Sequence, residues 1–479
     1  KLLSGKPACA DWYLPVRLHL EGHFFGRLKM VKNHWAAQVR HHWAAVLGAA
    51  TVSNGFNPTV QRWTHVREAA GKAETRLFDA SERLFGAERP EVIFWRDSAG
   101  WCPFCCMTWL LLEEMKVPYR IRTVPLRRYM LDGEQKDPEY LAMVGPQGVV
   151  PGVQFLTDDV DTFGSVMQDT ESIFDELRKR YPSRYPCGDP QVESRVCKGA
   201  DSIFARLRVA RRSYEACAGA DSLEKLEISL LRGALADLDG MLAAAPDGGP
   251  FLCGKTPTIP DLMLLPFLER TEAVVPYFWG SDMLASFPFS RAANLLQAAR
   301  SQPSGAFAHL CSDETTLART NLKYSASLLP HEPTAGVIDG TAVGTRNEWA
   351  ATASVAAKRE AAARLAANPE KVASFARRYA PEVQPTAPLR ASASVIEDAL
   401  LAVSELLLSE PQGNLEAATK EATSRVQAHH TTQDLVDAAV ALEALSLNIG
   451  VPRDMGEEAA RALRSHARIV AAALANTSA

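Results

Sequence analysis

Three of the nine cysteines stand within the run Trp101–Cys106. Cys102 and Cys105 have the Cys-x-x-Cys spacing of redox-active thiol pairs. The run follows an apolar stretch at residues 92–95, typical of a buried strand, and it opens a helical pattern. Free backbone N–H groups and the helix dipole favour a thiolate at a helix start, and the thiolate is the reactive form. We therefore expect Cys102 to be a nucleophile and Cys105, one turn further on, to resolve a mixed disulfide.

Two other interpretations of these cysteines stay open. The pair could form half of a zinc site, although no second Cys pair or His pair follows at zinc-finger spacing. Cysteines are also common as buried structural residues, which is the interpretation that we give to Cys106. We predict no metal site. Pro103 suits the first helical position, where the N–H that it lacks would have no partner.

Two further motifs lie downstream of the cysteines. Val149–Gly152 places a proline, Pro151, at the start of a predicted strand. Asp169 and Thr170 begin a predicted helix that stops before Pro182. Such a pair is an ordinary N-cap, which satisfies free backbone N–H groups. The same geometry can present a carboxylate and a hydroxyl to the ammonium and carboxylate of a ligand.

The elements around these motifs follow from the hydrophobic patterns. A strand at 92–95, a helix at Met107–Met115 and a strand at Tyr119–Val124 form a βαβ unit, which implies a parallel strand pair. Later elements in this block are a helix at 138–144, strands at 152–155 and 164–168, and a helix at 170–181. Long helical patterns then cover 194–218, 222–245, 261–274 and 291–300, and an ordinary amphipathic helix is predicted earlier, at 68–85.

The composition limits the class of protein. The 479 residues are 47% hydrophobic and 23% charged, which is the mixture of a soluble globular chain. The net charge of −4 disfavours nucleic acid as a partner. Apolar runs such as Ile469–Ala475 are too short to cross a bilayer, so we predict no transmembrane segment. The odd number of scattered cysteines is a poor disulfide framework and indicates a reducing compartment.

The region before residue 88 has a basic character. From His23 to Arg67 there is no Asp or Glu, and five histidines and three tryptophans lie in that window. Segments of this kind occur as organelle transit peptides and as surface-binding arms. The plainer interpretation is a helical extension that docks on the rest of the chain. The first residue is Lys1, so we expect a processed or truncated chain from an organelle, a plastid rather than a mitochondrion, either soluble or peripherally attached.

Taken together, these motifs resemble the cysteine-type glutathione transferases: the omega class, the plant dehydroascorbate reductases and the glutaredoxins. The resemblance rests on Cys102–Cys105, Leu112–Tyr119 and Pro146–Pro151. In the helical half, Phe251–Leu262 resembles the family's capping segment, in which Thr258 caps a buried helix and Asp261 stands three residues on. The whole chain is similar to a divergent algal or plastid-type glutathione-transferase-like protein with extra helices.

The resemblance implies an α/β thioredoxin-like domain followed by an all-α glutathione-transferase C-terminal domain, with α-helical extensions at both ends. We place the boundaries as follows: a basic helical N-terminal extension at 1–88, the thioredoxin-like glutathione-binding domain at 89–187, the all-α domain at 188–328, a linker at 329–345 and an Ala-rich helical extension at 346–479. Alanine favours helix but buries little area, so we expect the last region to lean on a neighbouring domain.

The resemblance also implies glutathione as co-substrate and a set of site residues. Cys102 would form a mixed disulfide with glutathione, and Cys105 could compete as resolving thiol. Val150 and a cis Pro151 would hold the cysteinyl backbone, with Phe104 in the same site. Asp169 and Thr170, chosen by register over the next two residues, would hold the γ-glutamyl end.

One departure concerns the glycyl carboxylate of glutathione. The reductases usually have a Lys where Val149 stands, so this contact must come from elsewhere, such as Arg127 or Arg128, or is lost. The segment Arg127–Lys136 is also long and charged.

These features favour glutathione-dependent thiol transfer that reduces disulfides, dehydroascorbate or related electrophiles. The competing interpretation is a non-catalytic scaffold subunit of a larger organellar complex, since this fold is reused in assemblies and fold does not determine function. A glutathione-bridged iron–sulfur or other metal-binding role is a third. Expected partners are a small-molecule thiol with an electrophile or disulfide, a protein complex through the terminal extensions, and a second copy in a homodimer.

Overall fold

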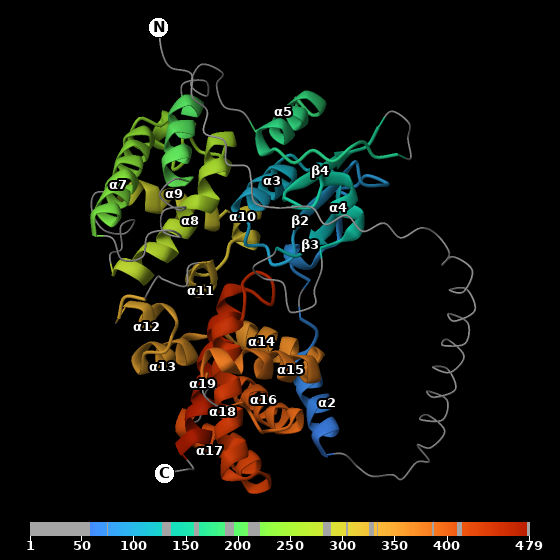
Figure 1. Cartoon of the computed structure of the whole chain (residues 1–479), viewed down its shortest axis with the longest axis vertical. Helices are drawn as coiled ribbons and strands as arrows, with labels where there is room; N and C mark the ends of the chain where they lie inside the picture. Colours follow the sequence, from blue (N-terminus) through green and yellow to red (C-terminus); the bar gives the residue numbers. More distant parts are fainter. Residues whose placement is uncertain are drawn as a thin grey trace, which may run out of the picture. The chain divides into compact units, whose positions relative to one another are not determined.

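The computed structural model describes residues 58–73, 75–126, 136–157, 162–186, 196–208, 221–280, 289–302, 305–324, 330–332, 334–385, 388–409 and 414–476. Most of the basic N-terminal window, together with Arg127 and Arg128, lies outside these ranges. Thr59–Ala479 form one compact unit, and the description below concerns that unit (Figure 1). None of the described helices is both long and apolar enough to span a bilayer.

A four-stranded mixed sheet carries the cysteine motif. Its strand order is β1 (Glu82–Arg83), β3 (Tyr119–Val124), β2 (Val92–Asp97) and β4 (Gly152–Phe155). Strands β2 and β3 are parallel, with Val92 opposite Tyr119, and β1 and β4 are antiparallel to their neighbours. The helix α3 (Pro103–Glu114) connects the parallel pair. The predicted βαβ unit is confirmed.

Two adjacent residues of β2 show how helices cover the sheet. Successive side chains of a strand point to opposite faces. Phe94 packs edge-on against Trp109 of α3, at 6.1 Å between ring centroids. Trp95 stacks at 4.8 Å on Tyr140 of α4 (Pro138–Val144). The helices α3 and α4 therefore cover opposite faces, and both aromatic pairs are buried.

The helical half begins with residues 196–208 and continues through α7 (Asp221–Ala243), α8 (Ile259–Trp279), α9 (Ser290–Arg300), α10 (Ala306–Leu310) and α11 (Glu314–Tyr324). The predicted cap of α8 is present. Asp261 Oδ2 accepts hydrogen bonds from the amide and the hydroxyl of Thr258, at 2.9 and 3.0 Å. Its Oδ1 accepts from the Leu252 amide at 2.9 Å, so the cap also ties the preceding loop to the helix.

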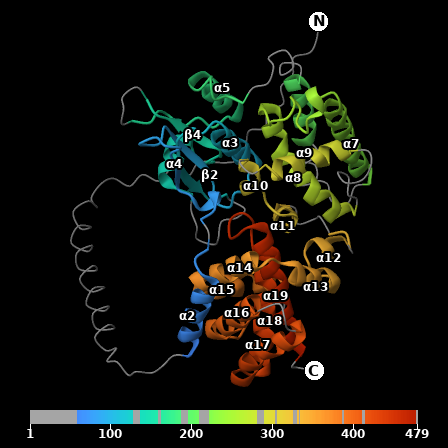
Figure 2. The same cartoon turned by 180° about the vertical axis from the view of Figure 1, so that it is seen from behind.

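The Ala-rich C-terminal region has a hydrophobic core of its own, and it also packs on the helical half, where Arg464 forms a buried ion pair with Asp313. Its helices are α13 (Val343–Thr352), α14 (Val355–Ala367), α15 (Pro369–Tyr379), α16 (Ala393–Leu408), α17 (Leu415–His429), α18 (Thr432–Asn448) and α19 (Glu457–Ala475). Buried alanines allow these helices to approach closely, and buried leucines fill the remaining space. Trp63 and Val66 of α2 (Pro58–Ala70) complete this core, and α2 lies beside α15 and α16 (Figure 2).

Three sequence expectations are wrong in detail. The helix predicted at 68–85 is not one element: α2 ends at Ala70, Gly71 adopts a positive φ of 72°, and residues 82–83 form β1. The sheet thus begins before the expected boundary at 88. The strand predicted at 164–168 is reduced to one isolated bridge, Val153–Met167, and a second bridge, Leu156–Phe163, lies just before the predicted range. The expected linker at 329–345 contains the short helix α12 (Thr334–Ile338) and the start of α13.

His466 lies in α19 and is 1% exposed. Its Nδ1 hydrogen-bonds with the Ala462 carbonyl at 2.7 Å, and burial lowers its pKa from 6.5 to about 4. A histidine whose pKa is lowered by folding binds fewer protons in the folded state than in the unfolded state. We therefore expect the protein to lose stability as the pH falls from 6.5 to about 4, by up to about 3 kcal/mol from this group.

Unfolding measured across pH 4–7 checks this expectation about His466. In His466→Gln the part of the acid sensitivity that comes from this group should be absent. Equal pH slopes in the two proteins would contradict a buried neutral imidazole.

Candidate functional site

Cys102 is the N-cap residue of α3, and Pro103 is the first residue of the helix. Cys102 is half-buried, whereas Cys105 and Cys106 are buried on the inner side of α3. The Cys102 Sγ lies 4.0 Å from the carbonyl oxygen of Val150. The structure thus brings together the two motifs that the sequence separates by 48 residues.

The two thiols of the Cys-x-x-Cys pair differ in acidity. A hydrogen bond from the Cys105 thiol lowers the pKa of Cys102, against burial and the charge of Asp97, which raise it. Burial raises the pKa of Cys105 well above its usual range, and the neighbouring Cys102 adds to the effect. Cys102 is therefore the thiol that ionises first, as a nucleophile must. Burial also raises the pKa of Cys106, which fits a structural role.

The loop before β4 holds the Val150 backbone next to Cys102. The Val150–Pro151 peptide is cis, as the resemblance implies. The carbonyl of Val149 accepts from the Tyr140 hydroxyl at 2.5 Å and from Gln168 Nε2 at 2.6 Å, so the loop is fixed from two sides. Among the described residues none accepts a hydrogen bond from the Val150 amide. A ligand with a peptide-like backbone could pair with Val150.

A cleft of about 500 Å³ opens beside this loop. It has the size of a small-molecule site. Five of the predicted residues line it, and Cys102 adjoins it through Val150 rather than lining it. The cleft is lined by Phe104, Met107, Val149, Val150, Pro151, Gln168, Asp169, Thr170, Glu171, Phe174, Asp175, Tyr185, Asp201, Phe204, Arg208, Ile259 and Met263.

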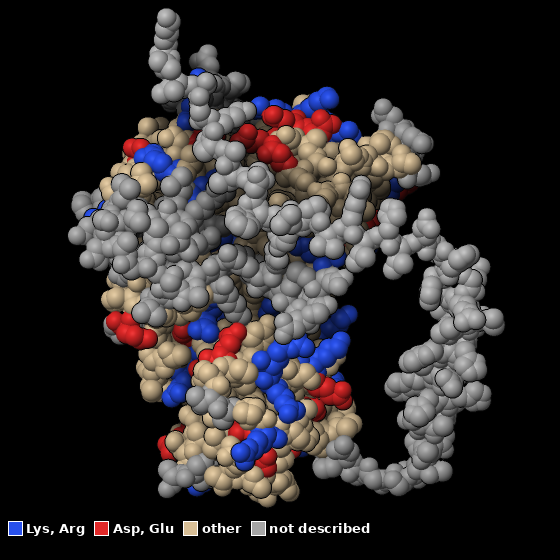
Figure 3. Space-filling view, in the orientation of Figure 1, with Lys and Arg blue, Asp and Glu red and all other residues tan. Residues whose placement is uncertain are grey.

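One edge of the cleft is acidic. Asp169 is the N-cap of α5 (Thr170–Arg180), and its Oδ2 accepts from the amide and the hydroxyl of Ser172, each at 2.8 Å. Glu171 and Asp175 follow on the same helix and also line the cleft. Figure 3 shows acidic side chains gathered over α5. The register of the sequence favoured Asp169 and Thr170 over Glu171, which also lines the cleft. Asp175 and Asp201, two further neighbours of this space, were not predicted.

Another part of the cleft lining is aromatic and carries a cation. Phe104, Phe204 and Phe267 pack edge-on, with Phe104 and Phe267 at 5.6 Å between centroids. The Arg208 guanidinium lies 5.6 Å from the rings of both Phe104 and Phe204. Among the described residues that line the cleft, Arg208 is the sole cation. Sequence reasoning missed it because nothing in the helical pattern around residue 208 distinguishes it from a solvated surface arginine.

The residue before the nucleophile is held by three separate parts of the chain. The Trp101 amide donates to Asp97 Oδ2 at 2.7 Å, and its carbonyl accepts from Arg270 Nη2 at 2.5 Å. Its indole Nε1 donates to the Val451 carbonyl at 3.1 Å. Strand β2, helix α8 and the loop between α18 and α19 therefore all position the start of α3. Burial raises the pKa of Asp97, whose side chain lies beneath this turn.

Comparison with known families identifies two matching segments. Residues 101–180 match the glutathione S-transferase N-terminal domain, and residues 221–305 match the glutathione S-transferase C-terminal domain. The first contains the cysteine motif, the Val150 loop and α5. The second contains the Thr258–Asp261 cap.

Two plant relatives match part of the chain. The Arabidopsis thaliana protein "Glutathione S-transferase DHAR3, chloroplastic" is 25% identical over 190 residues, which are 40% of this chain and 62% of that protein. This chain therefore spans less than two thirds of that relative. "Probable glutathione S-transferase DHAR1, cytosolic" from Oryza sativa subsp. japonica is 25% identical over 184 residues, 38% of this chain and 73% of the relative.

Solved structures match with lower identity. The dehydroascorbate reductase of Chlamydomonas reinhardtii has a TM-score of 0.35 at 19% identity and covers 44% of this chain and 89% of its own. The glutathione transferase Omega 1C of Trametes versicolor has a TM-score of 0.39 at 18% identity and covers 50% of this chain and 97% of its own.

Proposed function

Because it carries both domains of that family, the chain belongs to the glutathione S-transferase superfamily, and we propose that it is a glutathione-dependent thiol transferase or reductase with Cys102 as nucleophile. The observation that carries this proposal is the position of Cys102. It caps a helix at the edge of the cleft, its pKa is lowered, and its sulfur faces the backbone of Val150.

The proposed reaction has two thiol–disulfide exchanges. The Cys102 thiolate attacks the glutathione sulfur of a mixed disulfide, which forms a Cys102–glutathione disulfide and releases the substrate as a thiolate. The thiolate of a second glutathione then attacks the glutathione sulfur of that adduct. Oxidised glutathione leaves and Cys102 returns as the thiolate, so one disulfide is consumed and one is formed.

The cleft supplies contacts for each part of glutathione in this proposal. The amide and carbonyl of Val150 pair with the cysteinyl backbone, and the acidic edge at Asp169 receives the γ-glutamyl ammonium. Thr170 offers a hydroxyl to the neighbouring carboxylate. Arg208 is available to an anionic group, either the glycyl carboxylate or a carboxylate of the second substrate, and the Phe104–Phe204 wall favours an apolar body.

The test combines binding and turnover. We expect saturable glutathione binding, a single glutathione adduct on Cys102 that a thiol reductant removes, and glutathione-coupled reduction of a mixed disulfide or of dehydroascorbate. A protein that binds no glutathione and forms no adduct overturns the proposal. Migration with a large assembly, together with that inactivity, would favour the scaffold role instead.

The acidic edge offers a direct test of which carboxylate binds the ammonium. Both hydrogen bonds that Asp169 accepts go to Oδ2, which leaves Oδ1 for a ligand. Asp169→Asn keeps a good N-cap but removes the charge. We expect it to raise the KM for glutathione about tenfold, because the ligand ammonium loses one hydrogen bond to a charged group.

Glu171→Gln is the matched control for Asp169→Asn, since Glu171 lines the same cleft and is exposed. We expect it to change the KM less than about twofold, as is usual for exposed charges. The opposite ranking would assign the ammonium to Glu171.

We further propose a plastid location, which the printed name of the chloroplastic relative supports. Fractionation of the source cells with an antibody to this chain tests it.

A further inference from the structure

A second cavity, of about 420 Å³, lies in the C-terminal helices, away from the cleft that contains the cysteine motif. Its wall is formed by α14, α15, α18, α19 and the loop at residues 449–455. We call it the C-terminal cavity and define it by Leu365, Lys371, Val372, Phe375, Leu445 and Arg453. The proposed function makes no use of it.

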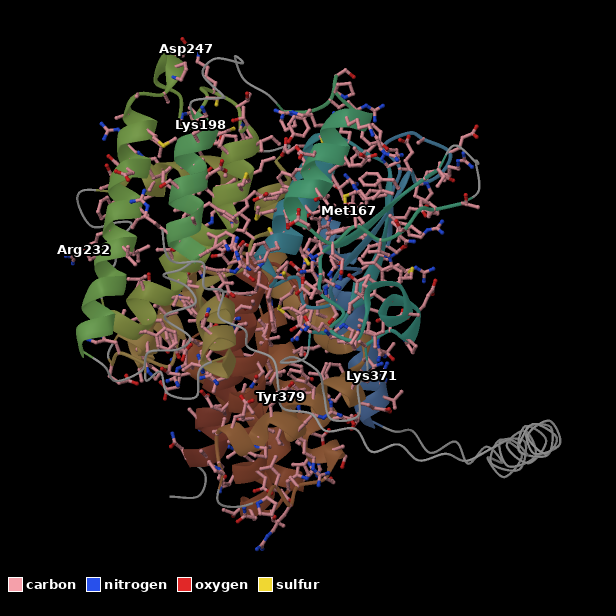
Figure 4. The ribbon with its side chains drawn as sticks, turned by 45° about the horizontal axis from the view of Figure 1, so that its top comes forward. Met167, Lys198, Arg232, Asp247, Lys371 and Tyr379 are labelled. Atoms are coloured by element: carbon pink, nitrogen blue, oxygen red, sulfur yellow. The ribbon has the colours of Figure 1, made fainter. Side chains whose placement is uncertain are left out.

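The lining of the C-terminal cavity combines apolar and basic side chains, and we call its charged residues the rim. The hydrophobic side chains of Val372 and Phe375 are only partly buried, and both line the cavity. Part of their apolar surface therefore faces it. Arg364, Lys371 and Arg453 supply three positive charges to the lining, and Asp454 supplies one negative charge. Lys371 and Tyr379, labelled in Figure 4, stand near the two ends of α15.

The charges of the rim are not all neutralised within the chain. Asp454 forms a bidentate ion pair with the Arg453 guanidinium at 2.6 and 2.7 Å and accepts from the Gly450 amide at 2.7 Å. This pair balances the charge of Arg453 and leaves its Nη1 group for a ligand. Arg364 pairs with Asp79 at 2.7 Å, and its Nε, which is buried without a hydrogen-bond partner, lies 4.0 Å from Glu360 Oε1. Lys371 is exposed, and no described carboxylate pairs with it. Figure 3 shows basic side chains gathered over α14 and α15.

The loop at 449–455 belongs both to this cavity and to the support of the nucleophile. Arg453 and Ile449 line the cavity. The Arg453 guanidinium also lies 5.1 Å from the ring centroid of Trp101, and Val451 in the same loop accepts the Trp101 indole hydrogen bond. Cys102 is the next residue. An anion that attracts Arg453 would therefore compete with its contact to Trp101.

From this arrangement we propose that the C-terminal cavity binds a small amphipathic carboxylate, and that its occupancy alters the reactivity of Cys102. The aliphatic body packs on Val372 and Phe375, and the carboxylate pairs with Lys371 and accepts a hydrogen bond from the Nη1 group of Arg453. This site is independent of glutathione, so the proposal does not rest on the proposed function.

The test uses decanoate below its micelle concentration, with the full chain. We expect saturable binding by calorimetry, and weaker binding of the uncharged methyl decanoate. Lys371→Glu should weaken decanoate binding roughly tenfold. It removes one exposed ion pair with the carboxylate and puts a repelling charge in its place, so the effect is about twice that of one such pair. Arg377→Glu is the matched control, because Arg377 is exposed on the same helix but does not line the cavity. Val372→Trp should fill the cavity and abolish binding.

The coupling is read from the rate at which iodoacetamide alkylates Cys102, after subtraction of the Cys102→Ser background. Decanoate should change this rate about threefold at neutral pH, because Arg453 that is drawn to the carboxylate no longer holds Trp101, the residue before Cys102. The proposal is overturned by absent saturable binding, by equal effects of Lys371→Glu and Arg377→Glu, by equal affinity for methyl decanoate, or by binding that leaves the alkylation rate unchanged. Should Val372→Trp fail to fold, the two charge variants still decide the result.

Discussion

Cys102→Ser should abolish thiol transfer, with a loss on the order of a thousandfold or more, because a covalent mechanism loses its nucleophile. A serine hydroxyl at the same N-cap position can still cap α3, so the fold should be unaffected. The measurement is the steady-state rate of glutathione-coupled disulfide reduction, with the thermal midpoint as a check on folding.

Cys105→Ser separates the nucleophile from its neighbour. The serine hydroxyl can donate the hydrogen bond that lowers the pKa of Cys102, so we expect most of the activity to remain. Cys105→Ala cannot donate it. In that variant the pKa of Cys102 should rise, and the loss of rate should be largest at low pH and recover as the pH increases. If Cys105→Ser is as inactive as Cys102→Ser, the resolving thiol is essential and the two-glutathione route is wrong.

The part of the site that could be predicted from the sequence is the part that depends on local structure. Cys102 at a helix start and the cap formed by Thr258 and Asp261 each lie within a few residues of their partners. Arg208 and Arg270 are different, since they reach the site from distant helices through tertiary packing. No spacing along the chain indicates such an approach.

The same reasoning explains the errors in the fold. The helix α12 spans only five residues, too few to be stable alone, and its neighbourhood is rich in glycine and proline. It is held by tertiary contacts: the hydroxyl of Thr315 donates to the Ile338 carbonyl at 2.6 Å, and Tyr277 donates to Asp339 at 2.9 Å. The Ala-rich helices have a core of their own because many small side chains are buried together, which is a property of the assembled set rather than of any one helix.

Arg464→Met should destabilise the chain strongly. Arg464 is fully buried in α19 and forms an ion pair with Asp313, which precedes α11. Its Nη2 also donates to Thr316 Oγ1 at 3.2 Å and to the Ile449 carbonyl at 2.8 Å. Burial alone would raise the pKa of Asp313, but the charge and hydrogen bonds of Arg464 and Thr316 lower it. Removing Arg464 leaves a buried carboxylate unpaired, at a cost of about 3–5 kcal/mol.

The stability lost in Arg464→Met should depend on pH, whereas a simple loss of packing would cost the same at every pH. In the wild type the ion pair stabilises the fold above pH 3.8, and this contribution is lost as the pH falls below that value. In Arg464→Met the unpaired Asp313 binds a proton more readily when folded, so the deficit should shrink as the pH is lowered towards 4. A deficit that does not change with pH would contradict an ionised, unpaired Asp313.

Two comparisons complete the test of this buried pair. Arg461→Met removes a half-exposed pair with Glu457, at 2.7 Å on the same helix, and a contact of the guanidinium with the Trp349 ring at 5.7 Å, and should cost no more than about 1 kcal/mol. The double variant Arg464→Met/Asp313→Leu removes both buried charges and should recover much of the loss, because the unpaired charge is the main cost.

Since Arg464 also holds the Ile449 carbonyl, Arg464→Met should loosen the 449–455 loop that supports Trp101. Faster hydrogen exchange at the Val451 amide would show that this pair stabilises the start of α3 as well as the C-terminal core.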